Sequence, residues 1–322
     1  MDYETLGNTG IQVSKLCFGT MSFGGNADEE TSRAMFNRCR EEGINFFDCA
    51  NVYNKGVSEE ILGRCIADSR NDIVLTTKVN GATASGINNK GLSRRHMMLE
   101  VENSLKRLNT DRIEFYFVHA FDPLTPIEET LRTMDDLQRQ GKILYPAVSN
   151  WAAWQIATAL GISAKESLAR FECVQPMYNL VKRQAEVEIL PLAAAENMGV
   201  ISYSPLGGGL LTGKYAGGKK PEQARLVVQK NYQKRYAENS YFETADRFTQ
   251  YAAEREVHPA TLAVAWVMSN PDVRAPIIGA RSLEQLEPSL AALKIDMTPE
   301  WRQEISGLSA APPLPTDRSE EG

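Results

Sequence analysis

Four side chains have the types and the spacing of a proton-transfer site: Asp48, Tyr53, Lys78 and His119. Three of them end apolar runs of strand length, and Tyr53 follows Asp48 after one short turn. Tyrosine has a reference pKa of about 10, and a neighbouring ammonium lowers that pKa because it favours the phenolate. We therefore expect Lys78 to activate the Tyr53 hydroxyl as a general acid for a carbonyl oxygen. Asp48 would hold Lys78, and His119 would orient the substrate oxygen or share the proton.

Each of these residues also has an ordinary structural role. A lysine at a strand end is usually a solvated or paired cation, and a lone histidine usually packs. A carboxylate that ends a buried strand is costly unless it is paired or faces a site, so Asp48 could simply be a cap or one half of a salt bridge. Tyr53 could be a packed ring. The shared position of three residues at successive strand ends favours a common site.

The strands that carry these residues belong to a regular alternation of strands and helices. Asp28 is expected to cap a helix over residues 29–42, and Ser93 is a good N-cap for the next long helix. Thr125 and Glu128 have the spacing of a capping box. After a hairpin over residues 3–14, strands are expected at residues 15–20, 44–48, 73–77, 113–118, 143–148, 172–175, 200–203 and 275–278.

Eight such alternations without an internal boundary predict one α/β domain over residues 1–310, a (β/α)8 TIM barrel with an N-terminal β-hairpin cap. A doubly wound open sheet is the alternative, but no Gly-x-Gly-x-x-Gly follows an early strand. The C-terminal strand ends of such a barrel form its active-site face, so the four candidate side chains can converge there. Residues 311–322 contain three prolines and end in Ser319-Glu320-Glu321-Gly322. We expect them to be a mobile tail.

The charge, the apolar segments and the cysteines of the chain indicate to which classes of protein it does not belong. The 322 residues carry a formal net charge of −6, which gives no indication of nucleic-acid binding. No segment approaches the ~18 apolar residues of a membrane span, so no membrane partner is expected. The five cysteines are scattered, with no Cys-x-x-Cys pair, and indicate neither zinc nor a disulfide framework. They are typical of buried thiols in a reducing cytoplasm.

Residues 207–245 break the strand–helix rhythm. The segment opens with three glycines, Gly207-Gly208-Gly209, and is locally basic in an acidic protein. Its cations are Lys214, Lys219, Lys220, Arg225, Lys230, Lys234 and Arg235. A long insertion at a barrel mouth is more often a functional loop than a spacer, and we expect this one to cover a bound cofactor.

With these motifs in place, the chain resembles the aldo-keto reductases from about Tyr3 to about Leu293. The matching stretches are Phe47-Asp48 with Tyr53, Thr77-Lys78, Val118-His119, Val148-Ser149-Asn150, Gln175, Tyr203-Ser204-Pro205-Leu206 and Gly279-Ala280-Arg281 with Gln285. The resemblance implies hydride transfer from NADPH to an aldehyde or ketone, with NADPH extended across the barrel mouth and no Rossmann fold. It implies that Tyr53 is the acid and that Asp48, Lys78 and His119 are its partners.

The resemblance also implies contacts along the whole of NADPH. Ser149, Asn150 and Gln175 match the residues that hold the carboxamide, whose donor and acceptor sites suit polar side chains. Tyr203 matches the ring that stacks on the nicotinamide. The pyrophosphate would lie against Ser204, Leu206, Gly208 and Lys214, and the 2′-phosphate end against Gly279, Arg281 and Gln285. The other implied cofactor contacts are Gly19, Thr20, Met21, Pro205, Leu210, Arg225 and Ile278. Many relatives have Glu-Asn where this chain has Pro288-Ser289, so the adenine contact departs from the pattern.

The substrate is not named by the sequence. The residues expected to form its pocket wall are Met21, Phe23, Asn80, Ala120, Phe121 and Trp151. Trp151 has an alternative role as a packing residue at the start of a helix. The partner implied by the resemblance is a small carbonyl compound, and association with further copies of the chain stays open.

Within the family, the long loops and the stretch from Gly19 to Gly24 resemble the branch with the potassium-channel β subunits and bacterial relatives. That branch supplies a rival function, a nucleotide-binding partner protein with little turnover. Its animal members carry asparagine at the position of His119, so His119 favours an enzyme. A barrel lyase with a Schiff-base lysine is a second rival, but Ser149-Asn150 and Tyr203-Ser204-Pro205-Leu206 would have no role in it.

Overall fold

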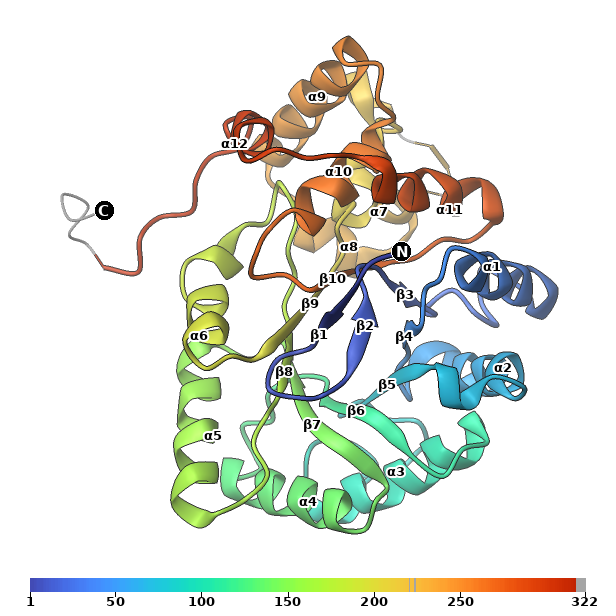
Figure 1. Ribbon diagram of the computed structural model, residues 1–322, viewed down its shortest axis with the longest axis vertical. Coiled ribbons are helices and arrows are strands. Elements are labelled where there is room, and N and C mark those ends of the chain that lie inside the picture. The colour runs from blue at the N-terminus through green and yellow to red at the C-terminus, as the bar shows by residue number, and fades with distance from the viewer. Residues whose placement is uncertain (220, 223, 317–322) are drawn as a thin grey trace.

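Eight parallel strands close into a barrel in the computed structural model, in the order β10-β3-β4-β5-β6-β7-β8-β9 (Figure 1). The structure describes residues 1–219, 221–222 and 224–316. The strands are β3 (Cys17–Gly19), β4 (Phe46–Asp48), β5 (Val74–Val79), β6 (Ile113–Val118), β7 (Ile143–Ser149), β8 (Cys173–Gln175), β9 (Gly199–Tyr203) and β10 (Ala275–Ile278). The predicted (β/α)8 barrel is confirmed.

The predicted hairpin is also present and closes one end of the barrel. Strands β1 (Tyr3–Thr5) and β2 (Gln12–Ser14) pair antiparallel. Leu6 and Val13 are fully buried in one cluster with side chains of the barrel interior, among them Phe46 and Phe115. Apolar side chains therefore fill the lower barrel, and the opposite end is left for polar groups.

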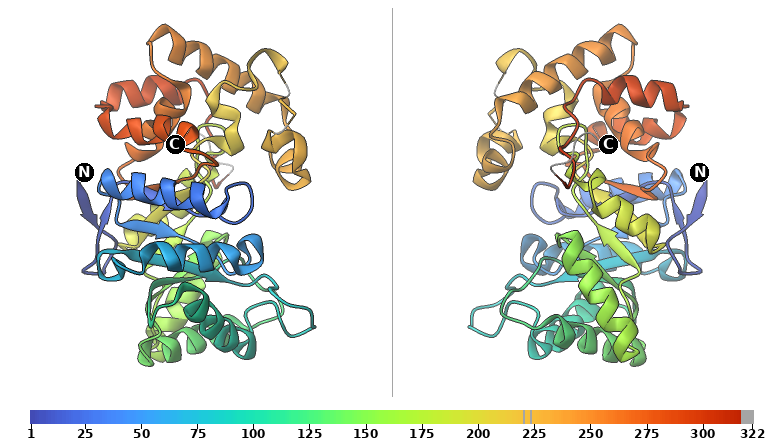
Figure 2. Two further views of the ribbon diagram at one scale, coloured as in Figure 1. Left: turned by 90° about the vertical axis from the view of Figure 1, so that its right-hand side faces the viewer. Right: turned by 90° about the vertical axis from the view of Figure 1, so that its left-hand side faces the viewer.

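Helices surround the barrel, as the two side views also show (Figure 2). They are α1 (Glu29–Glu41), α2 (Val57–Ile66), α3 (Arg94–Leu108), α4 (Ile127–Arg139), α5 (Ala153–Glu166), α6 (Ile189–Ala195), α9 (Asn239–Glu254), α10 (Pro259–Met268), α11 (Leu283–Leu290) and α12 (Pro299–Ser306). Asp28 and Ser93 cap α1 and α3 as predicted, since each side chain accepts a hydrogen bond from a backbone N–H of the first turn. Among the described residues, no helix is long and apolar enough to cross a membrane.

The capping box predicted before α4 is wrong. Pro126 is the N-cap of α4, and no side chain caps this helix. The Thr125 hydroxyl instead donates to the Asp122 carboxylate at 2.7 Å, and Glu128 accepts from Arg132 at 2.9 Å. Two loop N–H groups also donate to Asp122 and hold its carboxylate beside Thr125. The charged carboxylate is a strong acceptor, so it binds the hydroxyl that would otherwise cap the helix.

Residues 207–245 are not a plain loop but a series of short helices. They are η4 (Gly207–Thr212), η5 (Ala216–Gly218), α7 (Arg225–Val228), α8 (Lys230–Arg235) and the start of α9. Positive φ angles at Gly208, Gly209 and Gly213 interrupt the helical turns, because glycine accepts the left-handed conformation without strain. Lys220 of this segment and residues 317–322 of the expected tail lie outside the described residues.

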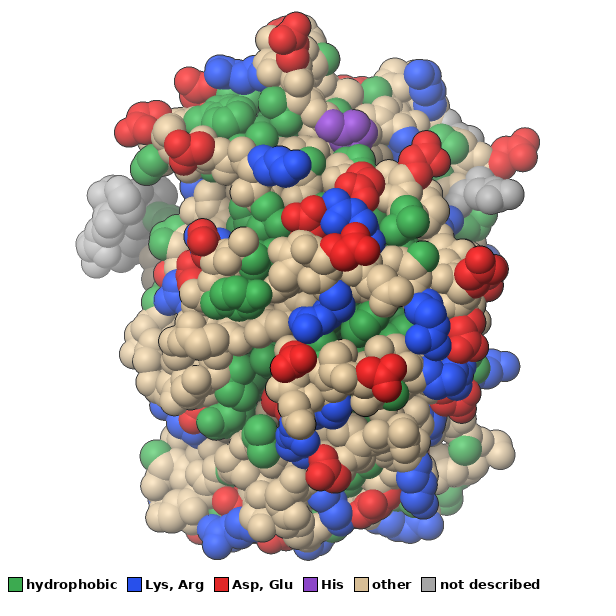
Figure 3. Space-filling model, turned by 45° about the vertical axis from the view of Figure 1, so that its right-hand side comes forward, with side chains coloured by type: hydrophobic (Ala, Val, Ile, Leu, Met, Phe, Trp, Pro, Cys, Tyr) green, Lys and Arg blue, Asp and Glu red, His purple; other side chains and the backbone are tan. Residues whose placement is uncertain are grey.

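The surface matches the modest net charge. On the face shown in Figure 3, acidic and basic side chains are interspersed rather than gathered into one large area of a single sign. Many are paired across neighbouring helices, as Arg64 of α2 is with Glu29 of α1 at 2.7 Å.

Candidate active site

A buried ion pair lies at the centre of the barrel mouth. The Lys78 ammonium is 2.6 Å from both carboxylate oxygens of Asp48 and donates to the Cys49 carbonyl at 2.6 Å. Asp48 also accepts from the Thr76 hydroxyl at 2.6 Å and from the Gln175 amide at 3.0 Å. Lys78 is 0% and Asp48 3% exposed, so these bonds replace the lost water.

The strand register explains this pairing. Asp48 lies opposite Thr76 on the neighbouring strand, and Lys78 follows two residues later, on the same face of β5. Burial lowers the pKa of Lys78, but Asp48, with smaller contributions from Tyr53 and Cys49, outweighs burial and raises that pKa above its ordinary value. Lys78 therefore stays an ammonium at neutral pH.

Tyr53 and His119 lie against this pair. The Lys78 nitrogen is 5.2 Å from the centre of the Tyr53 ring, and the ring centres of Tyr53 and His119 are 6.1 Å apart at an interplanar angle of 79°. The structure thus brings together all four residues singled out from the sequence.

The electrostatics of Tyr53 differ from the expectation. Burial raises the pKa of the Tyr53 hydroxyl to about 12, because it outweighs the lowering effect of the Lys78 ammonium. The predicted net lowering is therefore wrong, although the predicted sign of the Lys78 effect is correct. Burial, with a smaller contribution from Lys78, lowers the pKa of His119 to about 4. At neutral pH the site holds a protonated tyrosine, a neutral histidine and an ammonium.

A left-handed turn presents Tyr53 to the ion pair. Tyr53 begins the short helix η1 (Tyr53–Gly56), in which Asn54 and Lys55 have φ angles of 47° and 59°. The Asn54 amide donates to the carbonyls of Met21 and Phe23 at 3.1 and 2.7 Å. Asn54 therefore joins the turn to the loop after β3. Left-handed φ angles at residues other than glycine are strained, and this strain persists only where surrounding contacts hold the backbone.

A second polar group lies at the ends of β7, β8 and β9, next to His119. Asn150, with a φ of 58°, donates to the His119 carbonyl at 2.8 Å and to the Ser149 hydroxyl at 3.0 Å. The Tyr203 hydroxyl donates to the Asn150 side-chain oxygen at 2.7 Å. Ser149 donates to the Gln175 carbonyl at 2.9 Å. The four residues implied for the nicotinamide end thus form one cluster that reaches Asp48 through Gln175.

Three cations gather on the far side of the mouth, on segments distant in sequence. Burial lowers the pKa of Lys214, and the charges of Arg281 and Arg225 lower it further. Burial and the charge of Arg225 likewise lower the pKa of Arg281. The Arg281 N–H donates to the side-chain oxygen of Gln285 at 3.4 Å. Mutually repelling cations fit an anionic group such as a phosphate.

Glycines near these cations allow the chain to pack closely. Gly208 has a φ of +67°, and a Cβ there would lie 3.0 Å from the Tyr232 ring. A Cβ on Gly209 would lie 2.5 Å from the Lys214 nitrogen. Across the mouth, a Cβ on Gly279 would lie 3.3 Å from the Gly19 carbonyl oxygen. Ser204 has a left-handed φ of 61°, and Leu206 is half-buried. Other implied cofactor contacts have buried side chains and offer mainly backbone: Thr20, Pro205, Leu210 and Ile278.

Comparison with known proteins agrees with this geometry. A family model described as "Aldo/keto reductase family" matches residues 15–310. The chain belongs to the aldo/keto reductase family. It is therefore an enzyme of the oxidoreductase class.

Several relatives of this chain match over nearly their whole length. A "Probable voltage-gated potassium channel subunit beta" of Oryza sativa subsp. japonica is 36% identical over 98% of this chain and 99% of the relative. The "Uncharacterized oxidoreductase YrpG" of Bacillus subtilis is also 36% identical, over 97% of each chain. "Protein tas" of Escherichia coli is 29% identical over 96% of this chain and 97% of the relative.

The expected substrate wall of the reductase is only partly exposed. Phe23 is fully buried and packs on Phe18 with ring centres 5.9 Å apart, so it supports the loop after β3 and the prediction that it lines the pocket is wrong. Trp151 is 3% exposed, and it packs edge-on against Phe121 at 5.1 Å. Trp151 therefore has mainly the packing role that the sequence left open.

The other expected wall residues are more accessible. Met21 is 36% exposed, and Phe121 and Ala120 are half-buried. The Asn80 amide donates to the Ala120 carbonyl at 2.9 Å and joins two of the mouth loops. The sequence missed Trp154, which is 64% exposed and lies 6.4 Å from the Phe121 ring. Its place four residues after Asn150, at the start of α5, was the available indication.

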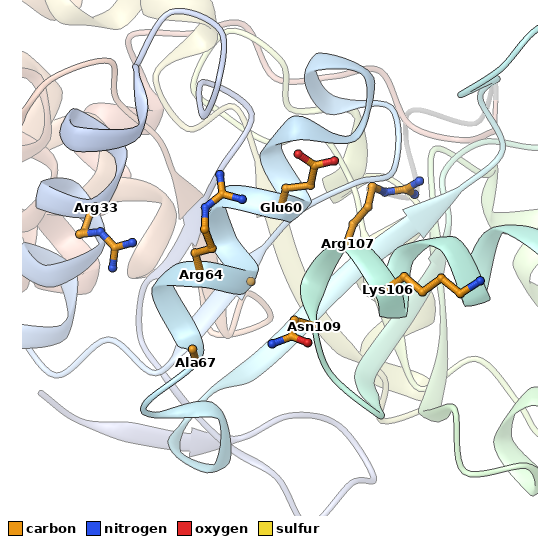
Figure 4. Close-up of a pocket in the computed structure, with 8 residues that line it drawn as sticks. Arg33, Glu60, Arg64, Ala67, Lys106, Arg107 and Asn109 are labelled. Carbon is orange, nitrogen blue, oxygen red and sulfur yellow. The ribbon is translucent and has the colours of Figure 1, made fainter.

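One cavity lies away from the mouth. It has a volume of about 690 Å³ and lies between α1, α2 and α3, where Figure 4 shows side chains of the outer helices around it. A smaller cavity of about 190 Å³ adjoins Asn150, Trp151 and Tyr203. The three arginines around the larger cavity, Arg33, Arg64 and Arg107, are each paired with an acid of α1 or α2, for example Arg107 with Glu59. The cluster of buried titratable residues makes the mouth the better candidate site.

Proposed function

We propose that this oxidoreductase reduces an aldehyde or ketone to the alcohol with NADPH, and that Tyr53 donates the proton. The observation that supports this most is the protonated Tyr53 between His119 and the buried Lys78 ammonium. A proton donor must be protonated before the reaction, and the raised pKa of Tyr53 meets that requirement.

NADPH, when bound, supplies the hydride. The residues of this chain fit it at both ends. Ser149, Asn150 and Gln175 offer the donors and acceptors that a carboxamide needs, and Tyr203 adds an aromatic face. Lys214, Arg225 and Arg281 offer charge for phosphates, and a third phosphate on the ribose distinguishes NADPH from NADH.

In this proposal the substrate carbonyl oxygen accepts hydrogen bonds from Tyr53 and from the neutral His119. Negative charge grows on that oxygen as the carbonyl carbon is reduced, and the Tyr53 proton moves to it. The tyrosine becomes a phenolate beside the Lys78 ammonium, which stabilises the new charge in a site with little water. Asp48 keeps Lys78 in place throughout. The cysteines are unpaired in the structure, in keeping with the reducing cytoplasm that we propose as its location.

The name of the rice relative supports a second candidate, a nucleotide-binding partner protein with little turnover. One experiment separates the two functions. Purified protein is titrated with NADPH while the cofactor fluorescence is followed, and a panel of aldehydes and ketones is then added. Steady loss of NADPH with at least one carbonyl compound supports the reductase. Binding without measurable oxidation across the panel supports the partner protein.

A further inference from the structure

A buried polar network lies on the outer side of β5, behind the candidate active site. Glu59 of α2 accepts from the Thr77 hydroxyl at 2.5 Å and from Arg107 of α3 at 2.6 Å. Arg107 is also 3.6 Å from Glu100, which lies about two turns earlier on α3. Glu59 is 0% and Glu100 2% exposed. Thr77 and Lys78 are adjacent on β5, so the network and the ion pair lie on opposite faces of the same strand.

Glu100 joins this network to the two loops beside the proposed carbonyl site. One carboxylate oxygen accepts from the side-chain amide of Asn51 at 2.8 Å. The other accepts from the Thr83 hydroxyl at 3.0 Å and from Asn103 at 2.9 Å. Asn51 lies two residues before Tyr53, and Thr83 lies in the loop that begins with Asn80.

The backbone strengthens the link between the network and Tyr53. The Asn51 N–H donates to the Lys78 carbonyl at 3.2 Å. At the other end of the turn, a Cβ on Gly56, where φ is +95°, would lie 2.8 Å from the Arg107 side chain. The segment with left-handed Asn54 and Lys55 is thus held at both ends.

Packing alone does not explain these three charges. Two carboxylates and a guanidinium lose their water when buried, and apolar side chains of similar volume would usually be as stable or more stable. Hydrogen bonds with fixed directions, by contrast, define where the attached loops lie. Both partners of Glu100 outside α3, Asn51 and Thr83, belong to loops at the barrel mouth.

We propose that Glu100 is a positioning residue for the proton donor, because its carboxylate fixes the Asn51–Gly56 segment through Asn51 and the residue 80–91 loop through Thr83. This inference rests on the proposed function, in which Tyr53 donates a proton. Glu100 does not touch the substrate; it acts through the two loops.

The test compares three single substitutions that each remove one hydrogen bond to the same carboxylate. Asn51→Ala releases the Tyr53 segment, and Thr83→Val releases the other loop. Asn103→Ala is the matched control, since Asn103 lies on α3 with Glu100 and anchors no loop. A misplacement of about 1 Å can cost about 10²-fold in rate, so kcat should fall about 10- to 100-fold in Asn51→Ala. Thr83→Val should mainly raise KM for the carbonyl compound, and Asn103→Ala should match wild type.

A second readout does not depend on turnover. Amide hydrogen exchange of the peptide that contains residues 49–56 should be faster in Asn51→Ala than in Asn103→Ala, in protein without NADPH. The NADPH dissociation constant should stay within about twofold in all three variants. A purely structural role would lower the thermal midpoint alike in Asn51→Ala and Asn103→Ala without a kcat difference between them.

Equal kcat and equal exchange in Asn51→Ala and Asn103→Ala would overturn the positioning role. That outcome is separate from failure of the proposed function, in which wild type itself would not oxidise NADPH with any carbonyl compound. Should Glu100→Gln fold, its kcat should fall at least as far as that of Asn51→Ala, since one amide cannot accept from both loops in the same way.

Discussion

Burial of Lys78 beside Asp48 determines the protonation states of the residues around it. The pair is neutral as a unit, yet the ammonium faces Tyr53 and adds to the cost of protonating His119. Because burial raises the pKa of Tyr53 to about 12, the tyrosine keeps its proton until a negative charge grows nearby. Lys78 acts on the product of that transfer, the phenolate, more than on the resting tyrosine.

The first prediction concerns the resting Tyr53. In protein labelled with 13C at the tyrosine ring, the Tyr53 resonance, assigned from Tyr53→Phe, should stay at its protonated position to about pH 10.5, beyond the ordinary midpoint. In Lys78→Met the midpoint can only rise further, because a cation beside a phenolate has been removed. A Tyr53 midpoint below the ordinary tyrosine value in wild type, or a lower midpoint in Lys78→Met, would contradict the account.

The second prediction concerns His119 and acid stability. Its pKa is about 4 in the folded protein against an ordinary 6.5, so the unfolded chain binds this proton first as the pH falls. The histidine therefore lowers the free energy of unfolding as the pH drops from about 6.5 to about 4. Urea unfolding at several pH values should show a shallower decline in His119→Asn than in wild type. Parallel pH profiles would show that His119 is not buried as described.

At the scale of the elements, strand ends supply the chemistry. The apolar runs bounded by turn residues predicted every barrel strand to within a few residues, since parallel strands buried on both faces leave a continuous apolar pattern. The sequence could therefore place Asp48, Lys78 and His119 at one end of the barrel. It could not show that Thr76 and Gln175 complete the shell of Asp48, because those bonds depend on register.

Other features escaped prediction for local reasons. Non-glycine residues with positive φ, such as Asn54 and Asn150, give no periodic pattern. Glu100 and Arg107 have the spacing of a solvated helix face, and only the packing of α3 on α2 makes them a buried network. The balance between burial and charge at Tyr53 also depends on packing that composition does not reveal.

The third prediction concerns the loop between β10 and α11. Arg281 lies among cations that fit a phosphate, and hydrogen bonds to charged groups contribute roughly 1.5–3 kcal/mol. Arg281→Ala should weaken NADPH binding about 10- to 150-fold and leave NADH nearly unchanged. Fluorescence titration with both cofactors measures this. Equal weakening of both, or an unchanged affinity for NADPH, would remove Arg281 from the 2′-phosphate contact.

The fourth prediction concerns residues 207–245 as a lid over the cofactor. Its glycines allow hinge motion, and its cations offer contacts to phosphates. Trypsin should cut this segment in the protein without cofactor, and NADPH should suppress the cut. The control is the same digestion with NADH, at a concentration that occupies the same fraction of the protein as NADPH does. The same cleavage rate with and without NADPH would argue against a lid.

At the scale of the whole molecule, the apolar residues that stabilise the barrel and the polar residues of the candidate site lie at opposite ends. The hairpin β1–β2 (Figure 1) and a cluster of apolar side chains close one end, and the polar residues around Asp48 lie at the other. Closure brings Gln175 to Asp48 across 127 residues of sequence, and Arg281 near Lys214. The alternation of strands and helices predicts the closed barrel. It does not predict these contacts across the barrel, because they depend on how the closed barrel aligns its strands.

The central claim is that the site at the barrel mouth reduces carbonyl compounds with a proton from Tyr53. The most direct measurement compares wild type with Tyr53→Phe, which removes the hydroxyl and keeps the ring. Both are assayed for NADPH oxidation with the best carbonyl compound of the panel, and for NADPH affinity by fluorescence. General acid catalysis contributes typically ~10²–10⁴-fold, so kcat should fall by that factor while the NADPH dissociation constant stays within about twofold. A Tyr53→Phe protein within a few-fold of wild type in kcat would contradict the claim.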